Sequence, residues 1–272
     1  MSLVALATAS PRVGRSTAGS RRALRVVERE GRAYRYSWPV FATGIVEPIF
    51  FLLSIGIGVG ELVGDLPGPG GVPISYRQFV APAMLANAAM NGAMFDATFN
   101  FFVKFKYLRI FDAMLATPLS VRDVIRGELM WSLGRGAFYA TTFLGAMAAF
   151  GLVESWWGLL AVPVALLVGF AFAGAGLGAT TYMRSFIDFD LVTLALVPLF
   201  LFSGTFFPLD RYPATLEAIV RVTPLYQGVV LSRAVILGDM HPGLFWHALY
   251  LAVMGWVGMR IASRRLGQLL QP

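Results

Sequence analysis

Long apolar runs, separated by short polar or interrupted segments, dominate the chain. Crossing a bilayer as a helix takes roughly 20 mainly apolar residues. Six runs approach or exceed this length, at about 38–59, 79–102, 127–152, 156–182, 191–207 and 244–260. None of them alternates strictly between apolar and polar positions, as the strand of a membrane barrel would. The pattern predicts an all-α integral membrane protein with six transmembrane helices in one domain, 38–272.

The composition supports this class. Hydrophobic residues make up 57% of the 272 positions and charged residues 14%, with a mean hydropathy of +0.68. Soluble domains carry about 25% charged residues. The missing charge has been replaced by blocks of Leu, Ala, Val and Phe, which places the chain among polytopic membrane proteins.

The basic residues gather in segments that would all lie on one side of the membrane. The segment before residue 38 holds Arg12, Arg15, Arg21, Arg22, Arg25, Arg29, Arg32 and Arg35. More cations follow the second predicted span and the last one. Because cytoplasmic loops are enriched in Lys and Arg, both termini are predicted to be cytoplasmic. The net charge of +7 is therefore attributed to orientation and anionic headgroups rather than to nucleic acid.

The N-terminal region divides into two parts. Residues 1–20 are rich in Ser, Ala, Gly and Arg and predict a disordered basic tail. Residues 21–37 mix apolar positions such as Leu24 and Val27 with arginines, which predicts an amphipathic helix lying on the inner leaflet. A solvated basic tail is the alternative.

The linker after the second span contains a short amphipathic pattern. Its apolar side chains recur at helical spacings over about 105–118, and Thr117-Pro118 ends the pattern. The side chains selected as its contact face are Tyr107, Ile110, Phe111, Met114 and Leu115. An apolar face on a cytoplasmic helix needs a cover, either a partner protein or the chain's own spans.

Four ionisable residues lie inside or near the ends of predicted spans: Glu47, Asp96, Glu128 and Arg135. Charges at this depth are costly and usually pair or face a cavity. The similar depths of Asp96 and Arg135 favour a structural pair between them, and a Glu47–Arg135 pair is the other option. A polar route for a headgroup and a proton relay are the functional alternatives. In the fourth span, Gly174 and Gly178 predict close helix packing rather than a gate.

The segment 203–235 breaks off the fifth apolar run. It contains two pieces, at about 213–237, that are each too short to cross a bilayer, and it predicts two re-entrant external helices. Its aromatic residues Phe206, Phe207, Tyr212 and Tyr226 are candidates for lining an exit. Anchoring of these rings among headgroups explains them equally well.

Catalytic motifs are missing from the sequence. A phosphate-binding loop would need Gly-x-x-x-x-Gly-Lys-Ser/Thr, and the two lysines lie in NFFVKFKYL. His241 and His247 lack the carboxylate neighbours of a zinc site. Ser203-Gly204 with His247 is similar to the layout of an intramembrane serine protease, but Leu201 replaces the first glycine of the nucleophile motif. No catalytic, cofactor-binding or metal-binding residue is predicted.

Several blocks resemble the permease subunits of type-2 ABC exporters, of the nodulation-type lipooligosaccharide and drug-export group. They are EPIFFLLSIGIGVG at 47–60, FVAPAMLANAAMNG at 79–92, LATPLSVRDVIRGEL at 115–129, FSGTFFPLDRYP at 202–213 and TPLYQGVVLSRA at 223–234. The resemblance implies that the helix at about 105–118 is a coupling helix seated on a separate ATPase, which binds the ATP. It also implies a second permease subunit and an amphipathic cargo. A secondary transporter or channel without an ATPase remains the alternative.

Overall fold

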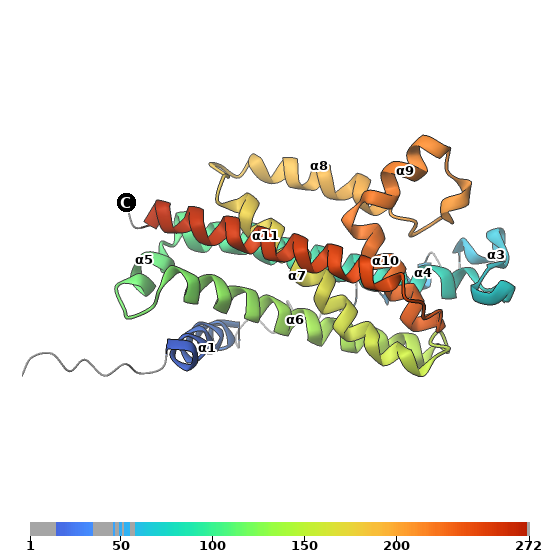
Figure 1. Cartoon of the computed structure of the whole chain (residues 1–272), viewed down its shortest axis with the longest axis horizontal. Coiled ribbons are helices and arrows are strands. Elements are labelled where there is room, and N and C mark those ends of the chain that lie inside the picture. Colours follow the sequence, from blue (N-terminus) through green and yellow to red (C-terminus); the bar gives the residue numbers. More distant parts are fainter. Residues whose placement is uncertain (1–14, 35–45, 47–48, 51, 55–57, 271–272) are drawn as a thin grey trace, which may run out of the picture.

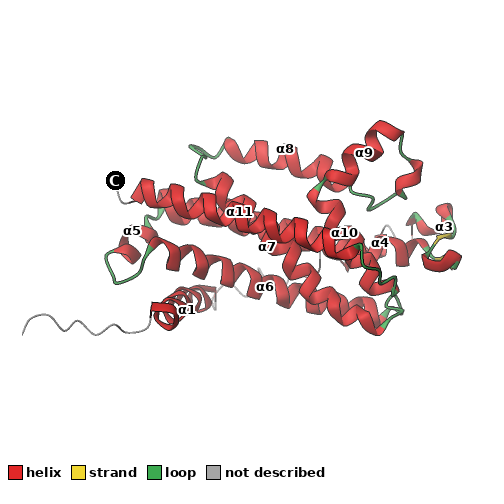
Figure 2. Cartoon of the chain, in the orientation of Figure 1, coloured by secondary structure: helices red, strands yellow, loops and turns green. Residues whose placement is uncertain are grey.

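The computed structural model describes residues 15–34, 46, 49–50, 52–54 and 58–270. Within them the chain is helical apart from turns, loops and one hairpin of two short strands (Figure 2). This agrees with the predicted helical class. Glu47 and most of the first predicted span, 38–59, lie outside the described residues, as does the tail 1–14.

The long helices run roughly side by side (Figure 1). They are α4 (Tyr76–Phe95), α6 (Val121–Ala149), α7 (Ala161–Thr180), α8 (Asp188–Leu201) and α11 (Leu244–Leu270). The 3-10 turn η4 (Trp156–Leu160) leads into α7. The short helix α5 (Ile110–Leu115) lies near the C-terminus of α11, whereas α3 (Gly60–Val63) and α9 (Ala214–Val222) lie at the opposite end. These ends are called the α5 end and the α9 end below.

α1 (Arg15–Tyr34) begins before the predicted start at residue 21. The predicted tail therefore extends too far, because no proline between residues 15 and 21 stops the helix. α1 packs across α6, and Gly127 permits the contact. A Cβ atom at Gly127 would stand 2.4 Å from Cβ of Val26.

Local polar signals set where two long helices begin. Ser75 and Gln78 form a capping box at the start of α4, and Ser120 and Asp123 form another at the start of α6. In each box the serine side chain accepts a backbone N–H bond while the second side chain accepts from the serine N–H. Such caps satisfy N–H groups that the helix itself leaves free.

α7 is the centre of the bundle, contacting α4, α6, α10 and α11. Its crossing with α11 brings backbone against backbone. A Cβ atom on Gly174 would stand 2.3 Å from the Gly255 carbonyl oxygen, and one on Gly258 would stand 2.3 Å from the Gly174 carbonyl carbon. The predicted close packing through small residues is therefore confirmed at Gly174.

The described helices do not by themselves establish six spans. By length and composition, two can cross a bilayer, Trp156–Thr180 and Leu244–Leu270, and the bent pair α9–α10 would make a third if it were one span. α8 has only 14 residues. α6 has 29 residues, but charges such as Asp123, Glu128 and Arg135 interrupt its apolar character.

The α9 end contains the irregular elements. α9 and α10 (Pro224–Leu237) meet at 82°, where Thr223-Pro224 interrupts the helix, on the residues for which two short helices are predicted. The turn η5 (Leu209–Arg211) precedes them. The loop before α4 holds the turn η1 (Pro69–Gly71) between β1 (Leu66–Pro67) and β2 (Pro73–Ile74), which pair antiparallel with Leu66 opposite Ile74.

Candidate coupling site

α5 is shorter than the predicted helix at 105–118, and the sequence placed its start wrongly. Residues Val103–Tyr107 form η3, a π-helical continuation of the α4 helix, so Tyr107 is not part of α5. Arg109 separates the two elements with φ of 47°. This left-handed conformation stops a right-handed helix.

The apolar face of α5 packs mainly against the chain's own bundle. Phe111 is completely buried and Met114 nearly so. The Phe111 ring lies 4.9 Å from the Phe101 ring, centre to centre. Ile110 and Leu115 are half-buried against the same cluster. The alternative of packing against the chain's own spans therefore holds for Phe111 and for most of Met114. Ile110 and Met114 also border the free surface of this segment.

That free surface is a groove between α1 and α5 of about 450 Å³. Its apolar lining includes Leu108, Ala113 and Leu119 of the linker, and Leu108 is 60% exposed. Its rim carries Arg25, Arg29 and Arg109. The sequence missed the part that α1 plays, because α1 and α5 are far apart along the chain.

Beneath this groove, three charged side chains from three elements meet. The Lys104 Nζ atom lies 2.8 Å from Glu30 Oε2 on α1 and 2.7 Å from Glu128 Oε2 on α6. The side chains of Glu30, Lys104 and Glu128 are 2%, 13% and 8% exposed. Arg29 adds a contact of 2.7 Å to Glu30 Oε1. We call Glu30, Lys104 and Glu128 the ion triad.

A second buried ion pair continues the polar contacts deeper into the bundle. Asp96 pairs with Arg135 of α6, as one of the two sequence hypotheses predicted. Asn100 donates to Asp96 Oδ1 at 2.6 Å. Asp96 and Asn100 bound the π-helical segment η2 (Asp96–Asn100). Asp96, Asn100 and Lys104 are spaced four apart and share one side of the helix, where all three line a small cavity together with Glu128.

Structural pairing therefore accounts for Asp96 and Arg135, and for one oxygen of Glu128. The second oxygen, Glu128 Oε1, is buried without a hydrogen-bond partner among the described residues, as is Ser132 Oγ one turn along α6. The sequence pointed to Asp96, Glu128 and Arg135. It missed Glu30 and Lys104, although Lys104 follows Asp96 and Asn100 at the same spacing of four.

The predicted exit residues lie around the loop that precedes α9. Phe206 packs edge-on to Phe200 at 5.0 Å between ring centres, and its carbonyl accepts from the Tyr76 hydroxyl at 3.2 Å. Phe207 is exposed. Burial raises the pKa of Tyr212, and Tyr226 lies near Gly204. Both interpretations of these rings, an exit lining and anchors among headgroups, therefore stay predictions.

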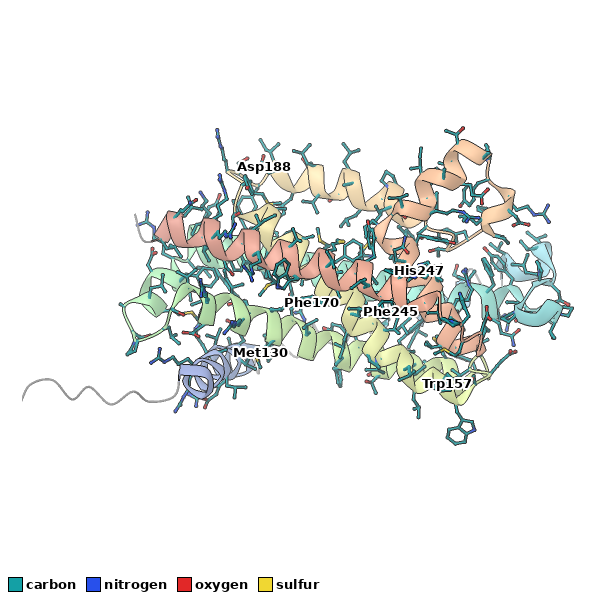
Figure 3. The ribbon with its side chains drawn as sticks, in the orientation of Figure 1. Met130, Trp157, Phe170, Asp188, Phe245 and His247 are labelled. Carbon is teal, nitrogen blue, oxygen red and sulfur yellow. The ribbon has the colours of Figure 1, made fainter. Side chains whose placement is uncertain are left out.

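The sharp bend between α9 and α10 is held from α11. The Gln227 amide donates to the Arg221 carbonyl at 2.6 Å, and His247 contacts Gln227 Oε1. The Tyr250 hydroxyl donates to the Val222 carbonyl at 2.9 Å. Figure 3 shows His247 on α11 where that helix passes α10. Side chains of one helix thus cap carbonyls at the end of another.

These contacts also bear on the protease hypothesis. The buried Ser203 hydroxyl lies 2.6 Å from Thr205 Oγ1 and 3.0 Å from the Phe200 carbonyl, whereas His247 contacts Gln227. A Ser–His pair needs the two side chains in hydrogen-bond reach, and no such bond joins them in the described chain. The same residues contain no group of three His, Asp or Glu side chains placed to hold a metal.

The described chain is thus helical, with a linker helix at one end and a bent helix pair at the other. A family model described as ABC-2 type transporter matches residues 23–237. The chain belongs to this family.

Curated relatives agree with the assignment. Nodulation protein J of Rhizobium leguminosarum bv. trifolii is 31% identical, over 82% of this chain and 85% of the relative. Nodulation protein J of Rhizobium meliloti is 30% identical over the same shares. The protein of that name in Azorhizobium caulinodans is 23% identical over 89% of this chain and 95% of its own length. The chain is accordingly a multi-pass membrane transport subunit of the ABC-2 type.

Proposed function

We propose that the chain is the permease of an ATP-driven exporter and that its α5 end receives a separate ATPase subunit. The observation that carries this proposal is the groove between α1 and α5. It is open, apolar along its floor and basic at its rim. A partner helix with an apolar stripe and acidic flanks would fit it, in the manner of an amphipathic helix laid in a groove. In this arrangement the termini and the α5 end are cytoplasmic, as the positive-inside rule predicts.

The ion triad would carry the motion of the docked ATPase into the bundle. Glu30 belongs to α1, which forms one wall of the groove, and Glu128 belongs to α6. A push on the groove would therefore move α1, the end of the α4 helix and α6 together. Such movement requires the ATPase to bind the two arrangements with different affinity.

The other proposed partner is a second permease subunit, identical or paralogous, with α8 at the interface. None of the 14 residues of α8 is buried, and Leu191, Leu194 and Val197 are at least half exposed. The cargo is proposed to be an amphipathic molecule such as a lipid-linked saccharide, which leaves past the α9–α10 bend. A hydrophobic drug would make the same chemical demands.

Filling the groove with a larger side chain tests the docking proposal. Ala113 lines the groove and is exposed, whereas Ala116 is exposed on the same segment but does not line it. The variant Ala113→Trp should reduce co-purification of the separate ATPase subunit at least about tenfold, a loss of ~1.4 kcal/mol. Ala116→Trp is the matched control. Phe111→Asp is a poor test, because a charge at this buried position would disturb the fold itself.

Normal ATPase recovery with Ala113→Trp would contradict the docking position. Failure of the unmodified chain to bind any ATPase, in detergent or in vesicles, would contradict the exporter itself and favour a transporter that works without one.

A further inference from the structure

The crossing of α7 and α11 leaves an open groove beside it. Direct contact between Gly174 and Gly258 removes side chains from the crossing point. The adjoining groove has a volume of about 740 Å³, within the ~300–1,000 Å³ typical of ligand sites. Small residues of α7, Ala175, Gly178 and Ala179, form part of its lining.

The α11 side of this groove is a long apolar stripe. Trp246, Val253 and Val257 line it at helical spacings, and each is more than 40% exposed. From Trp246 to Ile261 the stripe extends about 22 Å at 1.5 Å per residue. That length is well over half of a hydrocarbon core of about 30 Å, so an extended acyl chain could lie along it.

The stripe becomes basic toward the α5 end. Arg260 and Arg264 follow Val257 at spacings of three and four on α11. The Arg265 guanidinium lies 3.8 Å from the ring centre of Tyr182, a groove residue, and its Nε donates to the Thr181 carbonyl at 3.3 Å. The Arg260 guanidinium stacks on Trp256 at 4.4 Å. Tyr182 thus holds Arg265 at one end of the groove, and Trp256, which does not line the groove, holds Arg260 on an adjoining face of α11.

These cations differ from two buried cations of the bundle, Lys104 and Arg135. Lys104 and Arg135 each have a carboxylate partner. No described carboxylate lies within ion-pair distance of Arg260 or Arg265. Two positioned guanidinium groups without a counter-ion favour an anionic ligand, and a phosphate suits their donor geometry.

We propose that the groove binds one anionic phospholipid as a resident lipid, with an acyl chain along α11 and the phosphate beside Arg260 and Arg265. The glycine contact fixes α7 against α11, so the groove keeps its shape, which suits a lipid that stays rather than a cargo that leaves. The site does not depend on the proposed ATPase partner.

Fluorescence quenching of the full chain in vesicles tests this site. A variant keeping only Trp256, with the other tryptophans changed to Phe, reports the neighbourhood of Arg260. Vesicles contain phosphatidylcholine and phosphatidylglycerol, with brominated acyl chains on one or the other at equal mole fraction. The quenching of Trp256 should show that phosphatidylglycerol is enriched beside it at least about five-fold over phosphatidylcholine. This is the effect expected of a single basic side chain on anionic lipid.

The arginines provide the decisive comparison. Arg260→Gln with Arg265→Gln should abolish the preference, and Arg260→Lys with Arg265→Lys should retain most of it. Arg122→Gln with Arg126→Gln, at exposed positions of α6 at the same end, should leave it unchanged. Native mass spectrometry of the unmodified chain should show one retained phosphatidylglycerol, which guards against a poorly folded single-tryptophan variant.

Three results would overturn the proposal. Equal quenching by both lipids would mean that the groove meets only bulk lipid. A preference that survives the double Gln variant would place the anionic lipid elsewhere. Protection of Trp256 from both brominated lipids would mean that protein, such as a second copy, covers the groove.

Discussion

The two ends of the bundle hold their helices together by different chemistry. At the α5 end, buried ions join α1, the α4 helix and α6 through the ion triad and the Asp96–Arg135 pair. At the α9 end, the contacts are mostly neutral hydrogen bonds to backbone carbonyls, such as those of Gln227 and Tyr250. Even Arg233 there donates to the carbonyls of Phe79 and Gly204 rather than to a carboxylate.

The difference lies in the cost of breaking each kind of contact. Removing one partner of a buried ion pair leaves an uncompensated charge and costs about 3–5 kcal/mol. Losing a neutral hydrogen bond with a buried partner costs about 1–3 kcal/mol. The α5 end should therefore move as a unit, while the α9–α10 bend should rearrange at lower cost. A transporter driven from the α5 end and opening at the α9 end would need this asymmetry.

The largest expected effect is at Lys104. The variant Lys104→Met leaves Glu30 and Glu128 buried without a cation and should destabilise the chain by about 3–5 kcal/mol. Thermal unfolding in detergent, followed by size-exclusion fluorescence, measures the loss. Lys106→Met, two residues away and exposed, should stay within about 0.5 kcal/mol of the wild type.

Removing the acids should rescue this defect. Adding Glu30→Gln and Glu128→Gln to Lys104→Met eliminates the unpaired charges, so much of the lost stability should return. If Lys104→Met had the same unfolding temperature as the wild type, the ion triad would not be formed. The proposed stiffness of the α5 end would then have no basis.

A smaller effect is expected at Gln227, which joins α9, α10 and α11. The variant Gln227→Leu removes the bond to the Arg221 carbonyl and the contact with His247, which should cost about 1–3 kcal/mol. Gln268→Leu, at an exposed position of α11, is the control. A loss equal to that of Lys104→Met would remove the contrast between the two ends.

The smallest effect concerns the start of α8. The Asp188 carboxylate accepts from the backbone N–H groups of Arg184 and Ser185 at 2.6 and 3.0 Å, and these bonds hold its pKa below the ordinary value. A lowered folded-state pKa gives stability that is complete above the unfolded pKa of about 3.9 and fades as pH falls through the folded value. Asp188→Ala should thus have a slightly lower unfolding temperature than the wild type at neutral pH.

Acidification sharpens that test. The difference in unfolding temperature between the wild type and Asp188→Ala should narrow below about pH 4. Asp190→Ala, at a neighbouring exposed position, should unfold at the wild-type temperature at every pH. A gap that widens on acidification would reverse the sign and refute the cap.

Sequence patterns captured features that depend on local order along the chain. The bend at Thr223-Pro224 follows from proline chemistry, and the Asp96–Arg135 pair follows from helix depth. The start of α5 was misplaced because Arg109 adopts a left-handed conformation. Arginine has no marked preference for turns, so the sequence gives no sign of this break. The predicted coupling role of Phe111 stays a prediction, although its side chain is buried in the bundle. Helical spacing identifies an apolar face but does not say what covers it.

The ion triad was beyond sequence reasoning for a geometric reason. Glu30 and Lys104 are 74 residues apart, and their meeting depends on how α1 crosses α6 at Gly127. Likewise, the cationic groove of α7 and α11 arises only because the fold brings Arg265 to Tyr182 and Thr181. Arg265 and Thr181 are 84 positions apart along the chain. Six spans could be inferred from hydropathy, but 38–59 lies largely outside the described residues and α8 is short.

Transport by purified components tests the central claim most directly. The chain would be placed in sealed vesicles with or without its proposed ATPase subunit. The transbilayer movement of a fluorescent lipid-linked oligosaccharide would be followed with a quencher that cannot cross the membrane. The account predicts movement only when the ATPase and ATP are both present. Movement catalysed by this chain alone, without nucleotide, would contradict it.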